Sequence, residues 1–223
     1  MSATVSTLTG RRLYLCTPDR PDLADFLLAC MAGGVDVVQL RDRHLEARQL
    51  IERAKLAARC CASHGVPFIV NDRPDVALEA EADGVHVGQD DVPPGLARRL
   101  LGPTAIVGLS THSPSELVAS GHEPVDYVSA GPVEPTPTKP GRAGTGLDYV
   151  TLATSTATRP VFVTGGVRPQ TVPALVGAGA RQFVVVRYLT QSPDPGADAR
   201  KLASAIDEAI AQVQGAPADT HGL

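Results

Sequence analysis

The chain has 223 residues, a length that favours one domain and at most two. Its 20 basic and 24 acidic residues give a net charge of -4, so it lacks the basic excess with which proteins hold nucleic-acid phosphates, and we expect no nucleic-acid partner. Hydrophobic residues make up 43% of the chain and charged residues 20%, which excludes a wholly disordered protein. Because aromatic residues are only 4% and tryptophan is absent, we expect a core of Val, Leu, Ile and Ala.

The chain also lacks the patterns of membrane and secreted proteins. Its apolar runs are far shorter than the roughly 20 residues of a membrane-spanning helix, and we expect no membrane partner. Residues 1–10 show neither the basic nor the apolar region of a secretory signal, which favours the cytoplasm. The cysteines have the spacing of neither a disulfide framework nor a zinc site, and we expect buried reduced thiols at Cys16, Cys30, Cys60 and Cys61.

Eight short runs rich in Val, Leu and Ile alternate with segments of helical pattern, as in βα units on a parallel sheet. The predicted strands are Leu13–Cys16, Asp36–Leu40, Pro67–Val70, Gly84–Val87, Ala105–Gly108, Tyr127–Ala130, Val161–Val163 and Gln182–Val186. The predicted helices, several of which open with Pro or Ser, are Leu23–Met31, Leu45–Ala62, Pro74–Ala80, Pro94–Leu101, Ser113–Ser120, Tyr149–Thr154, Pro169–Val176 and Asp198–Val213.

This alternation predicts an α/β fold, a single-domain (β/α)8 TIM barrel over residues 11–214. Residues 1–10 and 215–223 are expected to be flexible ends. An open doubly wound sheet is the alternative, but it usually has fewer repeats, and no GxGxxG motif follows the first predicted strand.

In such barrels the chemistry lies at the carboxyl ends of the strands, so polar residues that follow the apolar runs are the site candidates. Strand alternation points Gln39, Arg41 and Arg43 to one side of the second predicted strand. The same alternation points Leu40 and Asp42 to the other side. Guanidinium groups suit phosphate oxygens, so this segment is expected to bind an anion. The alternative is that the arginines are solvated or paired with neighbouring carboxylates.

Two carboxylates follow the next predicted strands. Asn71 and Asp72 come after the third strand, and Asp91 comes after the fourth. Consecutive barrel strands are neighbours, so the two carboxylates can share one hard cation such as Mg²⁺, which proteins hold with one or two carboxylates plus substrate phosphates. The alternative is that Asp72 or Asp91 only caps the helix that follows it.

The fifth and sixth predicted strands lead to further polar groups. Ser110 follows the fifth strand, and the segment Gly131–Leu147 after the sixth is the longest loop of the chain. Loops of such length are usually functional or disordered. Within it, the hydroxyls of Thr136 and Thr138 and the ammonium of Lys139 suit a phosphate, although ordinary surface-loop chemistry explains them equally well.

The last two predicted strands indicate a second anion site. Gly165 and Gly166 follow the seventh strand and let a ligand approach the backbone, and the eighth strand ends at Val186 and Arg187. Barrels commonly hold a phosphate among the loops after these two strands. Two anion sites in one barrel predict two phosphorylated substrates or one bisphosphate.

Taken in order, the motifs QLRDR, VNDRPDVALEAEADGVHVGQDD, GLSTH, PTPTK, TGGV and VVVR resemble the thiamine phosphate synthase family. The resemblance covers nearly the whole chain, from Leu13 to about Val213, and the second motif is long and specific. It implies a (β/α)8 transferase of thiamine biosynthesis that joins the pyrophosphate ester of hydroxymethylpyrimidine to thiazole phosphate. The products are thiamine phosphate and pyrophosphate, and the implied cofactor is Mg²⁺.

The resemblance also implies roles for residues at matching positions. It implies catalytic roles for Arg41, Lys139 and Ser110 and magnesium ligation by Asp72 and Asp91. The implied substrate-binding residues are Gln39, Leu40, Arg41, Asp42, Arg43, Asn71, Ser110, Thr136, Pro137, Thr138, Lys139, Gly165, Gly166, Val186 and Arg187. The chain departs from the commoner pattern at Arg43, where lysine is frequent, and at Arg187, where serine is frequent. At Arg187 a backbone contact with the phosphate is therefore favoured over a side-chain contact.

Two other functions remain as alternatives. One is a thiazole phosphate tautomerase on a related barrel, which would not need the pyrophosphate ligands. The other is a non-catalytic sensor of a phosphorylated thiamine precursor. The residues Arg41, Asn71, Asp72, Asp91 and Lys139 favour the synthase. His86 and His112 are expected to be structural, and a homo-oligomer stays an open alternative to a monomer.

Overall fold

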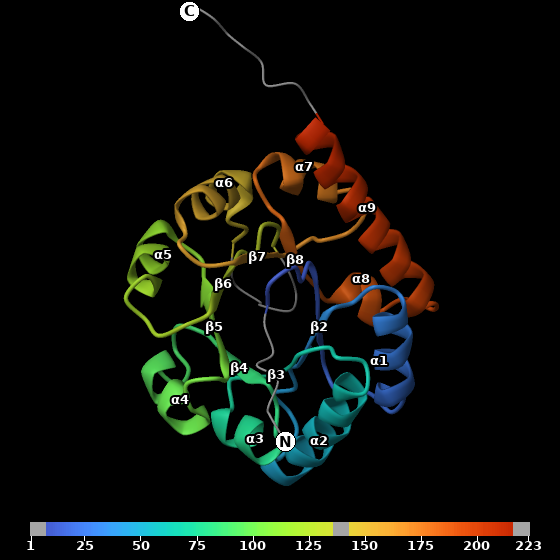
Figure 1. The fold of residues 1–223 in the computed structure, drawn as a ribbon, viewed down its shortest axis with the longest axis vertical. Helices are drawn as coiled ribbons and strands as arrows, with labels where there is room; N and C mark the ends of the chain where they lie inside the picture. The colour runs from blue at the N-terminus through green and yellow to red at the C-terminus, as the bar shows by residue number, and fades with distance from the viewer. Residues whose placement is uncertain (1–7, 136–142, 216–223) are drawn as a thin grey trace, which may run out of the picture.

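The computed structural model describes residues 8–135 and 143–215. Most of the two predicted flexible ends, residues 1–7 and 216–223, lie outside the described residues. The strands are β1 (Leu13–Thr17), β2 (Val37–Leu40), β3 (Phe68–Asn71), β4 (Gly84–Val87), β5 (Ile106–Thr111), β6 (Tyr127–Ala130), β7 (Val161–Thr164) and β8 (Gln182–Val185). They pair in parallel in chain order, and β8 pairs with β1 to close the barrel. The (β/α)8 prediction is confirmed (Figure 1).

Helices surround the barrel and cover its outer face, as Figure 1 shows. They are α1 (Leu23–Ala32), α2 (Ala47–Ala62), α3 (Pro74–Glu79), α4 (Pro94–Leu101), α5 (Pro114–Ser120), α6 (Gly146–Thr156), α7 (Val172–Gly177), α8 (Arg187–Thr190) and α9 (Pro195–Gly215). Within residues 8–135 and 143–215, none of these helices combines the length and the apolar character needed to cross a membrane.

Many element boundaries differ from the predicted ones by one to three residues, and one short helix was not predicted. Strand β5 runs to Thr111 rather than Gly108, because Ser110 and Thr111 still pair with β6. Helix α7 begins at Val172 rather than Pro169, since the Thr171 hydroxyl closes a turn ahead of it by donating to the Gly166 carbonyl. Helix α8 was not predicted, because a single turn of four residues is too short to show a helical period.

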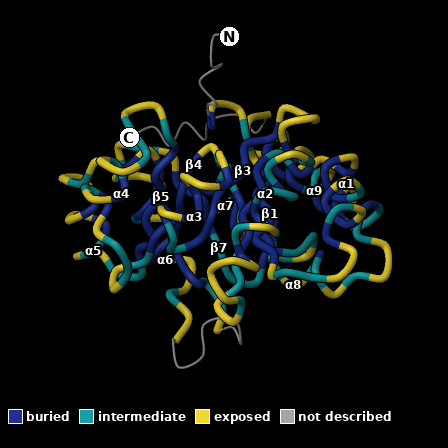
Figure 2. The backbone as a smooth tube through the Cα atoms, turned by 90° about the horizontal axis from the view of Figure 1, so that it is seen from below, coloured by how far each residue is buried: buried dark blue, intermediate teal, exposed yellow. Residues whose placement is uncertain are grey.

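The apolar core has two parts, and Figure 2 shows the buried strands at the centre. Inside the barrel, one cluster contains Leu8, Tyr14, Val37, Ile69, Ile106, Tyr127 and Phe162. A larger cluster fills the space between the strands and the helices. The branched residues predicted from composition dominate the outer layer, whereas three of the chain's few aromatic side chains fill the interior of the barrel.

The cysteine prediction is confirmed at three of four positions. Cys16, Cys30 and Cys61 are buried free thiols, but Cys60 is only half-buried. Cys60 and Cys61 are adjacent on α2, so the helix turns one of them towards the barrel and the other away from it. Burial raises the pKa of the Cys30 thiol to about 12, which keeps that group protonated and unreactive.

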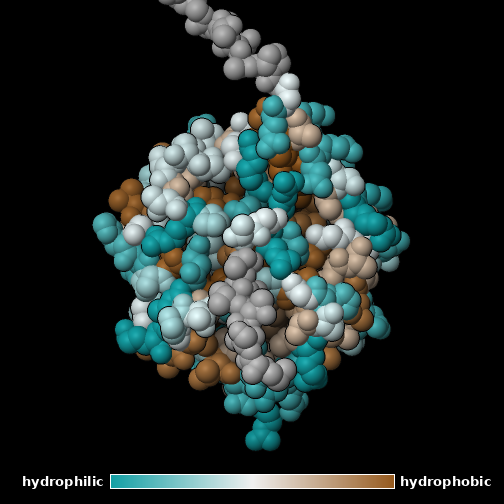
Figure 3. All heavy atoms as spheres, in the orientation of Figure 1, coloured by the Kyte–Doolittle hydropathy of each residue, from teal (hydrophilic) through white to brown (hydrophobic). Residues whose placement is uncertain are grey.

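Apolar side chains on the surface are dispersed over several helices. Figure 3 shows hydrophilic and hydrophobic residues interspersed over one face of the molecule. The exposed large hydrophobic residues are Leu28, Leu78, Leu96, Leu100, Val118, Leu147 and Val213. Singly exposed apolar residues are normal on a globular surface.

Three aspartates hold the amino ends of the strands together. Each lies just before an even-numbered strand and accepts a hydrogen bond from the backbone N–H at the start of the preceding strand. The pairs are Asp36 with Leu13 at 2.9 Å, Asp83 with Phe68 at 2.8 Å and Asp126 with Val107 at 2.7 Å. These N–H groups are thereby satisfied where the ladder has not yet begun. Asp36, which was predicted as the first residue of a strand, lies outside β2 for this reason.

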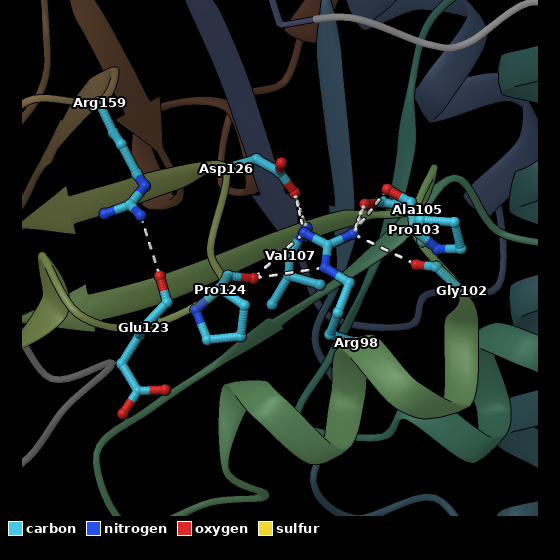
Figure 4. A network of polar contacts seen from close by, with 9 residues as sticks. All are labelled: Arg98, Gly102, Pro103, Ala105, Val107, Glu123, Pro124, Asp126 and Arg159. Atoms are coloured by element: carbon cyan, nitrogen blue, oxygen red, sulfur yellow. Dashed lines mark hydrogen bonds and ion pairs between the residues drawn. The ribbon is translucent and has the colours of Figure 1, made fainter.

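Arg98 of α4 joins one of these aspartates to two neighbouring loops (Figure 4). Its guanidinium donates to the Asp126 carboxylate at 2.6 Å and to the Pro124 carbonyl at 3.2 Å. It also donates to the carbonyls of Gly102, Pro103 and Ala105. Arg159 lies nearby and donates to the Glu123 carbonyl at 3.0 Å. One arginine therefore satisfies the carbonyls at the amino ends of β5 and β6.

Replacing Arg98 with methionine is expected to lower the free energy of unfolding by about 2 kcal/mol, because several carbonyls lose a donor. Denaturant unfolding measures this loss. The control is Arg99→Met, one residue later on α4, where the side chain is exposed. Equal stability losses in the two variants would contradict the role given to Arg98.

Candidate active site

A cavity of about 300 Å³ opens at the carboxyl ends of the strands. Residues from the barrel interior and from the loops after the strands line it. They are Tyr14, Cys16, Gln39, Arg41, Arg43, Asn71, Asp72, His86, Gly88, Asp91, Ser110, Tyr127, Ser129, Pro132, Thr164, Gly165, Gly166, Val167, Arg168, Val184, Val186, Arg187, Tyr188 and Gln191. The structure describes thirteen of the predicted site residues and metal ligands, and eleven of these thirteen line the cavity.

Two of the thirteen predicted residues that the structure describes lie away from the cavity wall. The two that do not line it are Leu40 and Asp42. Leu40 is buried in the apolar layer between the barrel and the helices. The Asp42 carboxylate accepts hydrogen bonds from the backbone N–H groups of His44 at 2.8 Å and Asp19 at 3.3 Å. Asp42 therefore joins the loops after β1 and β2 and holds the backbone that carries the two arginines.

The remaining predicted residues, Thr136, Pro137, Thr138 and Lys139, lie outside the described part of the chain. The two ends of their loop are tied together in the described part. The backbone N–H of Thr145 donates to the Pro132 carbonyl at 2.8 Å, and that of Val133 donates to the Thr164 carbonyl at the same distance. The loop therefore begins and ends at the rim of the cavity, next to β7.

Two of the cavity arginines, Arg41 and Arg187, differ from Arg43 and Arg168, which form ion pairs with carboxylates. Within residues 8–135 and 143–215, neither the Arg41 nor the Arg187 guanidinium group forms a hydrogen bond or an ion pair. Arg41 follows β2, as strand alternation predicted, and Arg187 opens α8 directly after β8. Guanidinium groups left unpaired at a cavity wall are suited to bind anions.

Arg43 lies against the two predicted metal-binding carboxylates. Its Nη2 is 2.7 Å from Asp72 Oδ2 and 3.9 Å from Asp91 Oδ2. Burial, and then the neighbouring Asp91 carboxylate, raise the pKa of Asp72, while Arg43 acts in the opposite direction. Two carboxylates converging on one point, with burial and mutual repulsion, are arranged to share a positive charge.

The alternative in which these aspartates cap helices is wrong. Helix α3 has Arg73 at its N-cap and α4 has Pro93, and neither helix has a side-chain cap. Asp72 instead has a φ of 61°, a left-handed conformation that is uncommon for a residue other than glycine. The Asp91 carboxylate accepts a hydrogen bond from the Gly88 N–H at 2.9 Å. Local backbone geometry therefore turns both carboxylates to the cavity.

A chain of buried hydrogen bonds forms the floor of the cavity. The Gln39 amide donates to the Tyr14 hydroxyl at 2.7 Å, and the Tyr14 and Tyr127 hydroxyls lie 2.9 Å apart. The Tyr127 hydroxyl lies 2.9 Å from His86 Nδ1, and His86 Nε2 lies 2.9 Å from the Ser110 hydroxyl. Two predicted residues, Gln39 and Ser110, are thereby joined through three side chains that were not predicted as site residues.

His86 was expected to have a structural role. In the structure its ring contacts two other side chains of the cavity wall. It is buried, its ring bridges Tyr127 and Ser110, and it lines the cavity. His112 does not line the cavity, and its Nδ1 contacts the Gly131 carbonyl.

A Cβ at Gly108 would lie 2.1 Å from Tyr127 Cζ, so the glycine makes room for the tyrosine ring.

Replacing Tyr127 with phenylalanine is expected to lower the free energy of unfolding by about 1 to 3 kcal/mol, because the Tyr14 hydroxyl and His86 Nδ1 each lose a partner. Denaturant unfolding measures the loss. Tyr149→Phe serves for comparison, because its hydroxyl donates to Thr111 at 2.8 Å on the outer side of the barrel. Wild-type stability in the Tyr127 variant would show that the floor does not depend on this hydroxyl.

The glycines after β7 are needed for a reason beyond ligand access. Gly165 and Gly166 have φ values of 95° and 79°, which favour glycine. A Cβ at Gly165 would lie 2.6 Å from Pro132 Cβ, and one at Gly166 would lie 2.5 Å from Glu134 Cδ. The glycines line the cavity, as predicted, but they also let the start of the long loop pack on the turn.

A family model described as thiamine monophosphate synthase matches residues 13–189. The chain belongs to the thiamine monophosphate synthase family. A thiamine-phosphate synthase of Mycobacterium sp. (strain KMS) is 45% identical over 212 residues, covering 89% of this chain and 94% of the relative. One from Acidothermus cellulolyticus is 44% identical over 206 residues, covering 90% of this chain and 97% of the relative. These findings confirm the resemblance seen in the motifs.

A solved structure agrees with this assignment. The thiamine phosphate pyrophosphorylase of Pyrococcus furiosus superposes with a TM-score of 0.82 at 26% identity, covering 89% of this chain and 96% of its own. The thiamine monophosphate synthase family therefore accounts for both the sequence and the fold. Neither the tautomerase nor the sensor alternative receives support from the similar proteins.

Tyr14, Cys16 and Tyr127 line the cavity, although the sequence motifs of the thiamine monophosphate synthase family did not mark them as site residues. A signal was present, because alternation along each strand places Cys16 two residues beyond Tyr14 on the same face of β1. The alternation of side chains along a strand does not predict which interior residues reach the cavity. That depends on the closure of the barrel.

Proposed function

We propose that this chain is a thiamine phosphate synthase that joins the pyrophosphate ester of hydroxymethylpyrimidine to thiazole phosphate and releases pyrophosphate. The observation that carries the proposal is one cavity lined by two sets of cationic residues, Arg41 and Arg43 after β2 and Arg187 after β8. Two phosphorylated substrates can then meet in one cavity. The family assignment supplies the substrate class.

Arg41 and Arg43 are proposed to bind the pyrophosphate group. Within the described residues, the Arg41 guanidinium forms no hydrogen bond or ion pair that it would have to break on binding a ligand. Its donors can therefore bind phosphate oxygens. Arg43 is held by Asp72, which fixes its position at the cavity wall. Lys139 and Asn71 are proposed to add further donors, although Lys139 lies outside the described residues.

Asp72 and Asp91 are proposed to hold a magnesium ion. The donor set fits, because hard oxygen ligands from one or two carboxylates, completed by phosphate oxygens and water, are typical of Mg²⁺. Within residues 8–135 and 143–215 no group of three or more His, Cys, Asp or Glu side chains could hold a metal. The proposal therefore needs the substrate to complete the site. The bound ion would supply charge neutralisation at the pyrophosphate.

The proposed reaction breaks one bond and forms one. The C–O bond between the pyrimidine methylene and pyrophosphate breaks first, and its electron pair leaves with the pyrophosphate oxygen. The lone pair of the thiazole nitrogen then forms the new C–N bond, which makes the thiazolium cation. No side-chain nucleophile is required, so the task of Arg41 and Arg43 is to stabilise the negative charge that develops on the leaving group.

The other end of the cavity is proposed to hold the thiazole phosphate. Gly165, Gly166 and the start of α8 at Val186 offer backbone N–H groups, and Arg187 offers a side chain. The hydroxyls of Thr136 and Thr138, which lie outside the described residues, are proposed to complete this cradle. The Gln39 to Ser110 chain forms the floor below the two rings.

The test is to mix the purified protein with both substrates and magnesium and to measure thiamine phosphate and pyrophosphate in equal amounts. Omitting either substrate should abolish both products. Adding a chelator should stop the reaction, and added magnesium should restore it. Isomerisation of the thiazole without pyrophosphate release, or binding without turnover, would overturn the proposal.

A further inference from the structure

An ion pair spans the rim of the cavity between the loops after β6 and β7. Arg168 Nη1 lies 2.9 Å from Glu134 Oε2, and Nη2 lies 3.2 Å from Glu134 Oε1. Each of the two guanidinium nitrogens therefore faces one carboxylate oxygen, a bidentate geometry that fixes direction as well as distance. Neither residue was singled out by the sequence motifs.

The pair rests on the glycine turn of the proposed phosphate site. Arg168 Nη1 also donates to the Gly166 carbonyl at 3.0 Å, and the Thr171 hydroxyl donates to the same carbonyl at 2.7 Å. From the other loop, the Glu134 side chain packs so closely on Gly166 that a Cβ there would lie 2.5 Å from its carboxyl carbon. Glu134 and Arg168 thus hold Gly166 between them.

The loop after β6 is joined to the end of β7 by a backbone hydrogen bond and to the loop after β7 by a side-chain ion pair. The Val133 N–H donates to the Thr164 carbonyl at 2.8 Å, one residue before the glycine turn. Beyond Val133, the Glu134 side chain links this loop to the residues after β7 through its ion pair with Arg168.

The charges also favour a positioning role. Glu134 is a carboxylate close to a proposed phosphate site, where an uncompensated negative charge would repel the ligand. The hydrogen bond from Arg168 lowers the pKa of Glu134, and the charge of Arg187 lowers it further. Glu134 therefore stays ionised and compensates the charge of Arg168.

We propose that Glu134 and Arg168 are positioning residues that set the width of the thiazole phosphate end of the cavity. The inference rests on the proposed function. Their side chains are 44% and 42% exposed, and exposed ion pairs contribute little to overall stability. Loss of the pair should therefore change substrate binding without unfolding the protein.

The experiment compares Glu134→Gln, Arg168→Met and the charge-swapped double variant Glu134→Arg/Arg168→Glu. Each single variant is expected to raise KM for thiazole phosphate about tenfold, with kcat and KM for the pyrimidine substrate within about twofold of wild type. The double variant is expected to recover most of the loss, because it restores the pair. The control is Glu79→Gln, which breaks the half-exposed Lys55–Glu79 pair between α2 and α3.

The outcomes separate the alternatives. If the pair acted only through charge, Glu134→Gln would lower KM for thiazole phosphate by freeing Arg168, and this result would overturn the inference. An unchanged KM in both single variants would also overturn it. A wild-type protein that forms no thiamine phosphate would instead refute the proposed function. Thermal melting of every variant checks that the fold is intact.

Discussion

Replacing Asp91 with asparagine is expected to lower kcat by about 10²- to 10³-fold, because one of the two carboxylates proposed to hold magnesium loses its charge. In the wild type, the Asp91 carboxylate accepts a hydrogen bond from the Gly88 N–H at 2.9 Å. Asparagine keeps a side-chain oxygen that can accept the same hydrogen bond. The local turn should therefore persist. Steady-state kinetics over a range of magnesium concentrations measures the effect, and the variant should need more magnesium than wild type.

The neighbouring Asp90 provides a matched control. It is exposed and does not line the cavity. Asp90→Asn changes the charge of the chain by the same amount, so it separates a general charge effect from loss of the ligand. Near-wild-type kcat and magnesium dependence in Asp91→Asn would rule out the assigned role.

Arg41→Ala is expected to give the other large effect, a fall in kcat/KM for the pyrimidine substrate of about 10²- to 10³-fold, because a donor to the developing charge is removed. Arg41 has no hydrogen-bond or ion-pair partner within the described residues, so the substitution leaves no protein group unsatisfied. The free energy of unfolding should stay unchanged or rise slightly. Kinetics with each substrate varied in turn, together with denaturant unfolding, measures both quantities.

Arg48 is the control for this prediction. It is an exposed arginine near the start of α2, seven residues further along the chain, and it does not line the cavity. Arg48→Ala is expected to leave both substrates' kinetics at wild-type values. A loss of stability in Arg41→Ala comparable to its loss of activity would show that the arginine has a structural role instead.

The barrel could be predicted because its signals are local. Runs such as Tyr127–Ala130, separated by helical segments, already mark the strands, and polar residues at their ends mark the rim of the cavity. The same reasoning placed Arg41 correctly and separated it from Leu40, which faces the apolar layer. It did not find the single turn of α8, since four residues carry no period.

The fold, the family and most of the polar cavity wall could be predicted from the amino-acid sequence, because strand alternation and strand-end position depend on residues close together in the chain. The floor and the rim of the cavity became visible only in the folded barrel. Tyr14 and Tyr127 are separated by 113 residues, and Glu134 and Arg168 by 34. These contacts exist because the parallel strands close into a ring, which brings distant residues together in a way that no local pattern records.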